Sequence, residues 1–262
     1  MDVLPSLLWF HSKGKDPALE LAREEALLES AVGSPFLVTW SWEKPVLVLG
    51  FGQGLEGIDL DFCHREGIAI LRRCSGGTGV IHHGDLSASL VLGPNHPWAS
   101  GIRSLYDHFT EAFRELLAVI GVAAGRPVPP PAGSRSRSPI CFEDRMAETL
   151  LAGGRKVLGC AQARRAAGVL VHGTLLLREN SSLTSSVFHV PGERVRGAFG
   201  PVPGGPHSVE ALARELGEVF AGSLNHELEE MSLPGPVEDA AHALLESRRG
   251  DTRWHPAVGS TD

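Results

Sequence analysis

The sequence predicts an α+β fold, a mixed and mostly antiparallel β-sheet with helices packed on it. Short apolar, strand-like segments come in groups that are separated by turns, and helical segments stand between and after these groups. The chain shows neither an internal repeat nor the strand–helix–strand alternation of a doubly wound parallel sheet. Its 262 residues are 42% hydrophobic, enough for one sizeable core, so we expect a single domain over residues 1–262.

The composition excludes several classes of protein. The net charge of -7 argues against nucleic acid as the main partner. The sequence has no run of eighteen apolar residues, which a membrane-spanning helix would need, and its N-terminus lacks a secretion signal. We therefore expect a cytoplasmic protein. The four cysteines form no CxxC pair, and we expect free thiols and no metal site. They are Cys63, Cys74, Cys141 and Cys160.

The first helix is predicted over residues 17–31, because Asp16 is a good N-cap and Pro17 fits the first turn. Strands are expected at 36–42 and 45–49. The glycine-rich segment 50–54 either turns a hairpin or passes close to a ligand or to another backbone segment. A short helix at 59–67 and a strand at 68–71 follow.

Residues 72–89, the arginine–glycine segment, combine two arginines, several glycines and two histidines in what reads as a loop between strands. Glycine lets the backbone approach a ligand, successive N–H groups can cradle an anion, and arginine binds carboxylate or phosphate groups. The segment therefore predicts a cradle for an acyl or phosphate group, although a plain turn is the alternative. It is neither a Walker loop nor a dinucleotide fingerprint, because no Gly-Lys-Ser/Thr follows and it leads into a strand at 87–92.

The second half of the chain begins with a long amphipathic helix over residues 102–120. The Pro/Gly/Ser/Arg-rich segment 126–139 is either a connector or a surface that presents Arg126, Arg135 and Arg137 to an acidic partner. A hairpin turn at 153–156 leads to a strand at 157–161, and a further strand covers 168–177. Residues 178–206 are expected to be irregular, and C-terminal helices to lie within about 208–250.

Five short segments occur in a set order along most of the chain. They are Gly50-Phe51-Gly52-Gln53, Arg72-Arg73-x-Ser75-Gly76-Gly77, His82-x-Gly84-Asp85-Leu86, Gly154-Arg155-Lys156-Val157-x-Gly159-x-Ala161-Gln162 and His172-Gly173-Thr174. In order and spacing they resemble the lipoate–protein ligase and octanoyltransferase family, which shares its catalytic fold with biotin protein ligase. The resemblance covers about residues 15–255 and implies that the single domain is an acyltransferase or ligase catalytic domain.

The resemblance implies that the protein attaches an octanoyl or lipoyl group to a lysine of a small acceptor. The acceptor would be the glycine-cleavage H protein or the lipoyl domain of a 2-oxoacid dehydrogenase. By motif match, Lys156 lies beside the acyl carbonyl as a catalytic residue. From the residue pattern alone, Lys156 would be expected to be a solvated lysine, and His172 a structural histidine. The matched substrate-binding positions are Arg72, Arg73, Ser75, Gly76, Gly77, His82, Gly159, His172 and Gly173.

Two chemistries share this family. Cys141-Phe142 stands fifteen residues before Lys156, as in the cysteine-dependent octanoyltransferases, and the chain has no room for the C-terminal accessory domain of many ligases. We therefore expect octanoyl transfer from acyl carrier protein through a Cys141 thioester, by a monomer that needs no cofactor. His82 or His83 is a candidate proton shuttle for the acceptor lysine.

The alternatives are a ligase that uses ATP and Mg²⁺ to form lipoyl-adenylate, and a non-catalytic protein that binds an acyl group or a lipoyl domain. Cys160, beside Lys156, and Cys74, within the arginine–glycine segment, are the competing nucleophiles.

Overall fold

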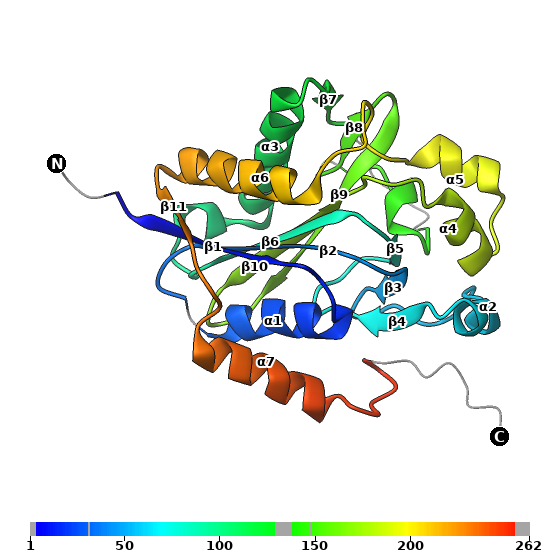
Figure 1. Cartoon of the computed structure of the whole chain (residues 1–262), viewed down its shortest axis with the longest axis horizontal. Helices are drawn as coiled ribbons and strands as arrows, with labels where there is room; N and C mark the ends of the chain where they lie inside the picture. The colour runs from blue at the N-terminus through cyan, green and yellow to red at the C-terminus, as the bar shows by residue number, and fades with distance from the viewer. Residues whose placement is uncertain (1–3, 31, 129–137, 147, 255–262) are drawn as a thin grey trace.

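Two sheets organise the protein in a computed structural model that describes residues 4–30, 32–128, 138–146 and 148–254 (Figure 1). The large sheet has the strand order β11-β1-β2-β6-β10-β9-β8-β7, and the small sheet has the order β4-β3-β5. The strands of the large sheet are β1 (Ser6–Ser12), β2 (Phe36–Ser41), β6 (Leu86–Leu92), β7 (Ala124–Gly125), β8 (Leu150–Ala152), β9 (Arg155–Arg164), β10 (Val169–Leu175) and β11 (Glu227–Glu230). Those of the small sheet are β3 (Val46–Leu49), β4 (Ala69–Arg72) and β5 (Val80–His82).

The large sheet is mixed and mostly antiparallel, which confirms the expected fold class. Strand β1 runs parallel to β2 and β11, and the pairs from β2 through β6, β10, β9 and β8 to β7 are antiparallel. The expectation of no strand–helix–strand units is wrong. Helix α1 (Pro17–Glu29) joins the parallel pair β1–β2, and helix α2 (Leu60–Arg65) joins the parallel pair β3–β4. Strand β1 is not among the strands predicted from the sequence, so no strand–helix–strand unit was expected around α1.

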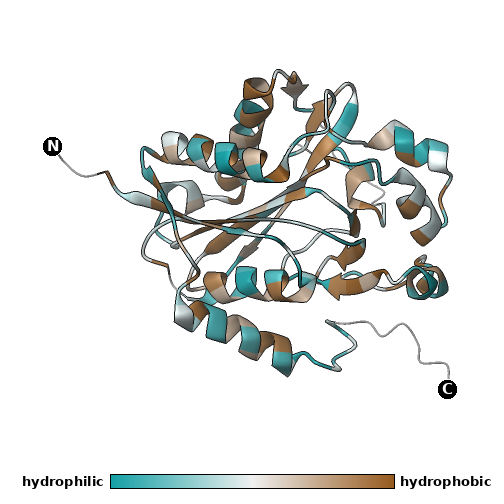
Figure 2. Cartoon of the chain, in the orientation of Figure 1, coloured by the Kyte–Doolittle hydropathy of each residue, from teal (hydrophilic) through white to brown (hydrophobic). Residues whose placement is uncertain are grey.

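Helices cover both faces of the large sheet (Figure 1). Helices α3 (Ile102–Val119) and α6 (Val209–Leu224) pack on one face, where the rings of Phe109 and Phe220 lie 5.6 Å apart. Helices α1 and α7 (Gly235–Ser247) pack on the other face, against residues such as Trp40 and Leu170. Figure 2 shows apolar residues concentrated along the central strands and the inward helix faces, as expected of two layers of helices on a sheet.

The expectation that residues 178–206 are irregular is wrong. Helices α4 (Ser181–Val187) and α5 (Gly192–Ala198) lie there and pack with α2 and the small sheet in a separate apolar cluster. Their Ser, Thr and Gly residues are weak helix formers. Burial of Val187, Val195 and Phe199 stabilises these short helices through tertiary packing, which a local pattern does not reveal.

The predicted hairpin turn between β8 and β9 is confirmed. Gly153 and Gly154 have φ values of +56° and +77°, in the left-handed region that favours glycine. The turn places Lys156 at the start of β9, where the side chain is buried. Within the described part of the chain, no helix is both long enough and apolar enough to cross a lipid bilayer.

The glycine-rich segment 50–54 does not turn a hairpin. It leaves β3 and passes so close to the arginine–glycine segment that a Cβ on Gly50 would lie 2.0 Å from the backbone oxygen of Gly77. Phe51 N donates to Ser75 O at 2.8 Å across the same junction. The glycine is thus required by a close approach between two backbones.

Gly50→Ala is expected to force these two segments apart and to destabilise the protein by about 1–3 kcal/mol, the usual cost of overpacking. Gly52→Ala is the matched control, because no atom lies within 4 Å of a Cβ built there. Thermal denaturation followed by circular dichroism measures the difference in stability. Equal melting temperatures of the two variants would contradict the requirement for glycine at position 50.

Candidate active site

Three chain segments meet beside the large sheet: residues 50–53, the arginine–glycine segment, and the stretch that leads into the short 3-10 helix η2 (Cys141–Glu143). Gly79 N donates to Pro139 O at 3.0 Å, and Cys141 N donates to Gly79 O at 2.9 Å. Gln53 Nε2 also donates to Pro139 O, at 3.1 Å. Backbone pairing of this kind fixes the position of Cys141 relative to the arginine–glycine segment.

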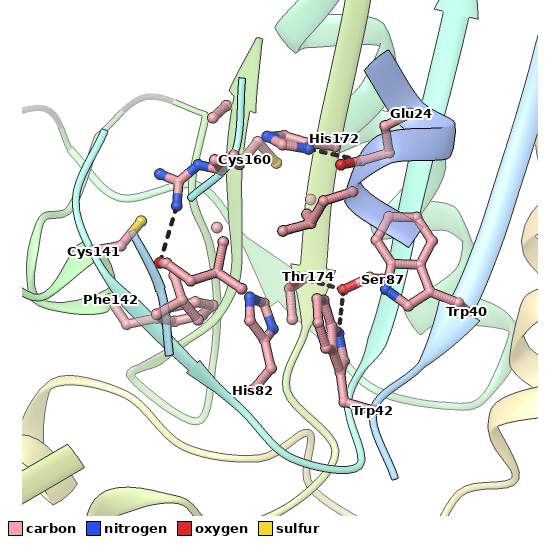
Figure 3. A pocket seen from close by; sticks show the side chains of 17 residues that line it. Glu24, Trp40, Trp42, His82, Ser87, Cys141, Phe142, Cys160, His172 and Thr174 are labelled. Carbon is pink, nitrogen blue, oxygen red and sulfur yellow. Dashed lines mark hydrogen bonds and ion pairs between the residues drawn. The ribbon is translucent and has the colours of Figure 1, made fainter. Parts of the chain in front are cut away.

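A cavity opens between these segments and the strands β2, β9 and β10 (Figure 3). The space inside it, including the part open to solvent, is about 450 Å³. Most of the wall is apolar, from Leu21, Trp40, Trp42, Val48, Val80 and Phe142. Such a lining suits a hydrocarbon chain, and its polar groups are few and specific.

Two glycines keep the strands of the cavity wall close to their neighbours. A Cβ on Gly173 would lie 2.8 Å from the Phe109 ring and 3.1 Å from Cys160 Sγ. A Cβ on Gly159 would lie 3.3 Å from the Phe142 ring. Both glycines line the cavity, and a larger residue at Gly159 would press on the Phe142 ring of its wall. Substrate binding by these glycines stays a prediction.

A buried polar network runs along the cavity wall from Arg73 to helix α1. The Arg73 guanidinium donates to Ser75 Oγ at 3.0 Å, and Ser75 Oγ lies 2.6 Å from His172 Nε2. His172 Nδ1 lies 2.8 Å from Glu24 Oε1, which also accepts a hydrogen bond from Ser89. Because each member is hydrogen-bonded and enclosed, the network fixes the arginine and the histidine in place.

The Arg73 guanidinium also donates to three backbone carbonyls, those of Val48, Gly76 and Thr78, at 2.8–3.3 Å. Burial lowers the pKa of Arg73 from its ordinary value, and a nearby Cys141 thiolate would act in the opposite direction. Arg73 therefore places a positive charge within electrostatic reach of Cys141.

Arg72 lies outside this cavity, although it is adjacent to Arg73. Its guanidinium donates to the carbonyls of Gly50 and Gln53, both at 2.6 Å, and to Arg253 O at 2.5 Å. It thus joins the segment 50–53 to the C-terminal segment. Substrate binding by Arg72 stays a prediction that this arrangement does not favour.

The structure corrects the expectation that both histidines of the arginine–glycine segment lie in a loop. His82 ends strand β5, which has only three residues, all buried, and pairs with β3. Its ring lines the cavity and stacks on Trp42, with 4.3 Å between centroids and 16° between planes. Burial, followed by the charges of Arg73 and His172, holds the pKa of His82 well below its usual range. His83 does not line the cavity.

Cys141 and Cys160 both line the cavity and are partly exposed. Although part of the Cys160 residue is exposed, its thiol is enclosed by protein atoms; this burial raises the thiol pKa, so the thiol stays protonated near neutral pH. Cys74 is buried among the residues between α1 and β3, outside the cavity, and burial raises its pKa as well. These environments favour Cys141 as the reactive thiol.

Lys156 holds the turn that carries Cys141. Its ammonium donates to Cys141 O at 2.9 Å and to Asp144 O at 2.7 Å, and lies 5.1 Å from the centre of the Phe142 ring. An ammonium has three donors, so one N–H remains for another acceptor. In the described residues, no group of three or more His, Cys, Asp or Glu side chains is arranged to hold a metal ion.

The structure thus brings six of the predicted residues to one cavity and places Ser75 and Lys156 directly behind its wall. Those at the cavity are Arg73, His82, Cys141, Gly159, His172 and Gly173. Gly76 and Gly77 belong to the segment that Arg73 and Gly50 contact. Sequence reasoning missed Glu24, Trp40 and Trp42. Glu24 left a signal, since it stands between Leu21 and Leu28 on the buried face of α1.

The expected arginine surface of residues 126–139 is only partly described. Arg126 forms an ion pair with Asp107 and donates to Thr110 Oγ1 at 2.6 Å, so it packs against α3. Arg135 and Arg137 lie outside the described residues. Binding of an acidic partner by these arginines stays a prediction.

The family is established by comparison with known proteins. The model of the lipoyl protein ligase A/B catalytic domain matches residues 16–228. The chain therefore belongs to this family, and the resemblance carried by its motifs is confirmed.

Within the family, the chain is similar to proteins named octanoyltransferase LipM. The one from Oceanobacillus iheyensis is 28% identical over 260 residues, which cover 93% of this chain and 94% of that protein. The one from Moorella thermoacetica is 35% identical over 192 residues, which cover 69% of this chain and 68% of that protein.

Solved structures share the fold. A Thermoplasma acidophilum protein with bound lipoic acid superimposes with a TM-score of 0.81 at 22% identity, covering 97% of this chain and 98% of that one. Lipoate-protein ligase A bound with ATP has a TM-score of 0.80 at 24% identity, again covering 97% and 98%. These structures confirm the lipoate ligase type of fold expected from the motifs.

Limiting iodoacetamide near neutral pH is expected to modify Cys141 before Cys160, Cys74 and Cys63. The thiolate is the reacting species, and burial raises the thiol pKa of the other three cysteines, to about 11 for Cys63. Peptide mapping by mass spectrometry gives the order of modification. Preferential labelling of Cys160 would refute the choice of Cys141.

Proposed function

We propose that this enzyme transfers an octanoyl group from acyl carrier protein, through a thioester on Cys141, to a lysine of a lipoyl-domain acceptor. The family and the LipM relatives identify an octanoyltransferase of protein lipoylation. The donor, the thioester, the acceptor and a cytoplasmic site of action are our proposal. We propose as acceptor the glycine-cleavage H protein or a 2-oxoacid dehydrogenase lipoyl domain, and no bound cofactor.

The position of Cys141 is the observation that carries this proposal. The residue is partly exposed, lines an apolar cavity and is held by the backbone of Gly79. An acyl group bonded to Sγ would have the apolar cavity within reach for its hydrocarbon chain. A ligase that activates its substrate as an adenylate needs no thiol at this place, so the partly exposed cysteine favours covalent transfer.

The first half-reaction is a thioester exchange. Cys141 attacks the carbonyl carbon of the donor thioester as a thiolate, and the carrier thiolate leaves. Because one thioester replaces another, the step is nearly balanced in energy and needs no ATP. The remaining N–H of Lys156 and backbone N–H groups near Gly76 and Gly77 are the proposed donors to the developing oxyanion.

The direct test is intact-mass measurement after incubation with octanoyl-acyl carrier protein. An octanoyl adduct is expected on the wild-type protein and on Cys160→Ser, the matched control within the same cavity, but not on Cys141→Ser. Absence of the adduct from the wild type, together with modification of an H protein by lipoate and ATP, would instead identify a ligase. A protein that binds the acceptor and does neither would be a non-catalytic binder.

A further inference from the structure

His82 and Asp85 form a buried pair at the wall of the cavity. Gly84, with φ of +69°, turns the chain sharply between β5 and β6 and brings Asp85 back towards the His82 ring. His82 Nδ1 lies 3.8 Å from Asp85 Oδ2 and has no hydrogen-bond partner among the described residues. Because Nδ1 is on the Asp85 side, Nε2 is the ring nitrogen on the cavity side. Figure 3 shows the ring between Phe142 and Trp42.

The orientation of the His82 ring is fixed by a second contact, the stacking of Trp42 on the face of the ring. Trp42 stacks on it and is itself held, because its Nε1 donates to Ser87 Oγ at 2.8 Å. Ser87 Oγ in turn lies 2.7 Å from Thr174 Oγ1. A general base must be held in a defined geometry towards the proton that it takes, and this stack supplies that constraint.

Asp85 is fully buried and is positioned by the backbone. Its carboxylate faces the N–H groups of His83 at 3.3 Å and Leu177 at 3.4 Å, long contacts that leave it weakly compensated. Arg178 is the cation that acts on it. The charges that act on the pKa of His82 are those of Arg73 and His172, and the Asp85 carboxyl lies 3.8 Å from its Nδ1.

We propose that His82, positioned and polarised by Asp85, is the general base of the second half-reaction, in which the acceptor lysine attacks the acyl-enzyme. The lysine nitrogen bonds to the thioester carbonyl carbon, and one amine proton passes to His82 Nε2. The C–S bond then breaks, and its electron pair leaves on Cys141 Sγ. The imidazolium formed next to Asp85 gains an ion-pair partner in a buried site, which makes the proton transfer more favourable. This proposal rests on the proposed thioester mechanism.

The pair has a distinctive pH dependence. Burial raises the pKa of Asp85 to about 8, whereas burial and the charges of Arg73 and His172 lower that of His82. The active base form has an ionised Asp85 and a neutral His82, so the transfer step should become faster as pH rises through about 8. The acceptor lysine titrates alike in every variant, so the contribution of the pair is the difference between the wild type and Asp85→Asn. In Asp85→Asn the pair keeps only His82, so this contribution should move to a pH below the ordinary histidine pKa.

The experiment separates the two half-reactions. The octanoyl-enzyme is formed first and quantified by intact mass, and a lipoyl-domain acceptor is then added in single-turnover measurements across a pH series. Asp85→Asn is expected to form the acyl-enzyme at the wild-type rate, to transfer the acyl group roughly a hundredfold more slowly, and to shift the pH limb downward. His83→Gln, altered at the neighbouring residue outside the cavity, should match the wild type.

Several outcomes would overturn the proposal. Asp85→Asn transferring at the wild-type rate, or losing both half-reactions equally with an unchanged pH limb, would mean that Asp85 only holds the turn. If this variant does not fold, His82→Gln carries the same test, with acyl-enzyme formed and transfer lost. Failure of the wild type to form any acyl-enzyme would reject the proposed function, and with it this role of the pair. A variant that slows both half-reactions equally, while the wild type still forms the acyl-enzyme, would reject only the role of the pair.

Discussion

The pairing of Gly79 with residues 139–141 is the interaction on which the rest of the site depends. Two backbone hydrogen bonds place the Cys141 turn against the arginine–glycine segment, and Lys156 ties the same turn to β9 through the carbonyls of Cys141 and Asp144. Gly79 directly precedes β5 of the small sheet, and Lys156 lies in β9 of the large sheet, so the Cys141 turn is held between the two sheets. The thiol is therefore positioned by main-chain geometry, which side-chain motion does not readily disturb.

Buried charge around the cavity is compensated locally, and this decides which groups stay available for chemistry. Glu24 Oε1 is hydrogen-bonded to His172 and Ser89, while the Arg73 guanidinium donates to backbone carbonyls and to Ser75. A buried network with each member paired is rigid. Among the groups that line the cavity, Glu24 Oε2, Trp40 Nε1 and His82 Nδ1 have no hydrogen-bond partner in the described residues, and His82 Nδ1 faces the Asp85 carboxyl at 3.8 Å. The cavity thus combines a fixed frame with one histidine free to exchange a proton.

Much of the fold and site could be predicted from the sequence where the signal is local. The capped helix after Asp16, the turn at Gly153-Gly154 and the amphipathic helix ending near Ile120 each follow from a few neighbouring residues. Strand β1 and helices α4 and α5 could not be predicted in this way, because their stability comes from partners distant in sequence. The same holds for Arg72 and Arg73, identical neighbours whose guanidinium groups reach different places only through tertiary contacts.

The central claim is that an acyl group on Cys141 Sγ occupies the apolar cavity between Trp42, Val80 and Phe142. A crystal structure of the octanoylated protein tests it most directly. We expect continuous density from Cys141 Sγ into that cavity, with the carbonyl oxygen near Lys156 and the 76–77 backbone. Density for the octanoyl group on Cys160, or a chain that extends from Cys141 into solvent, would contradict it.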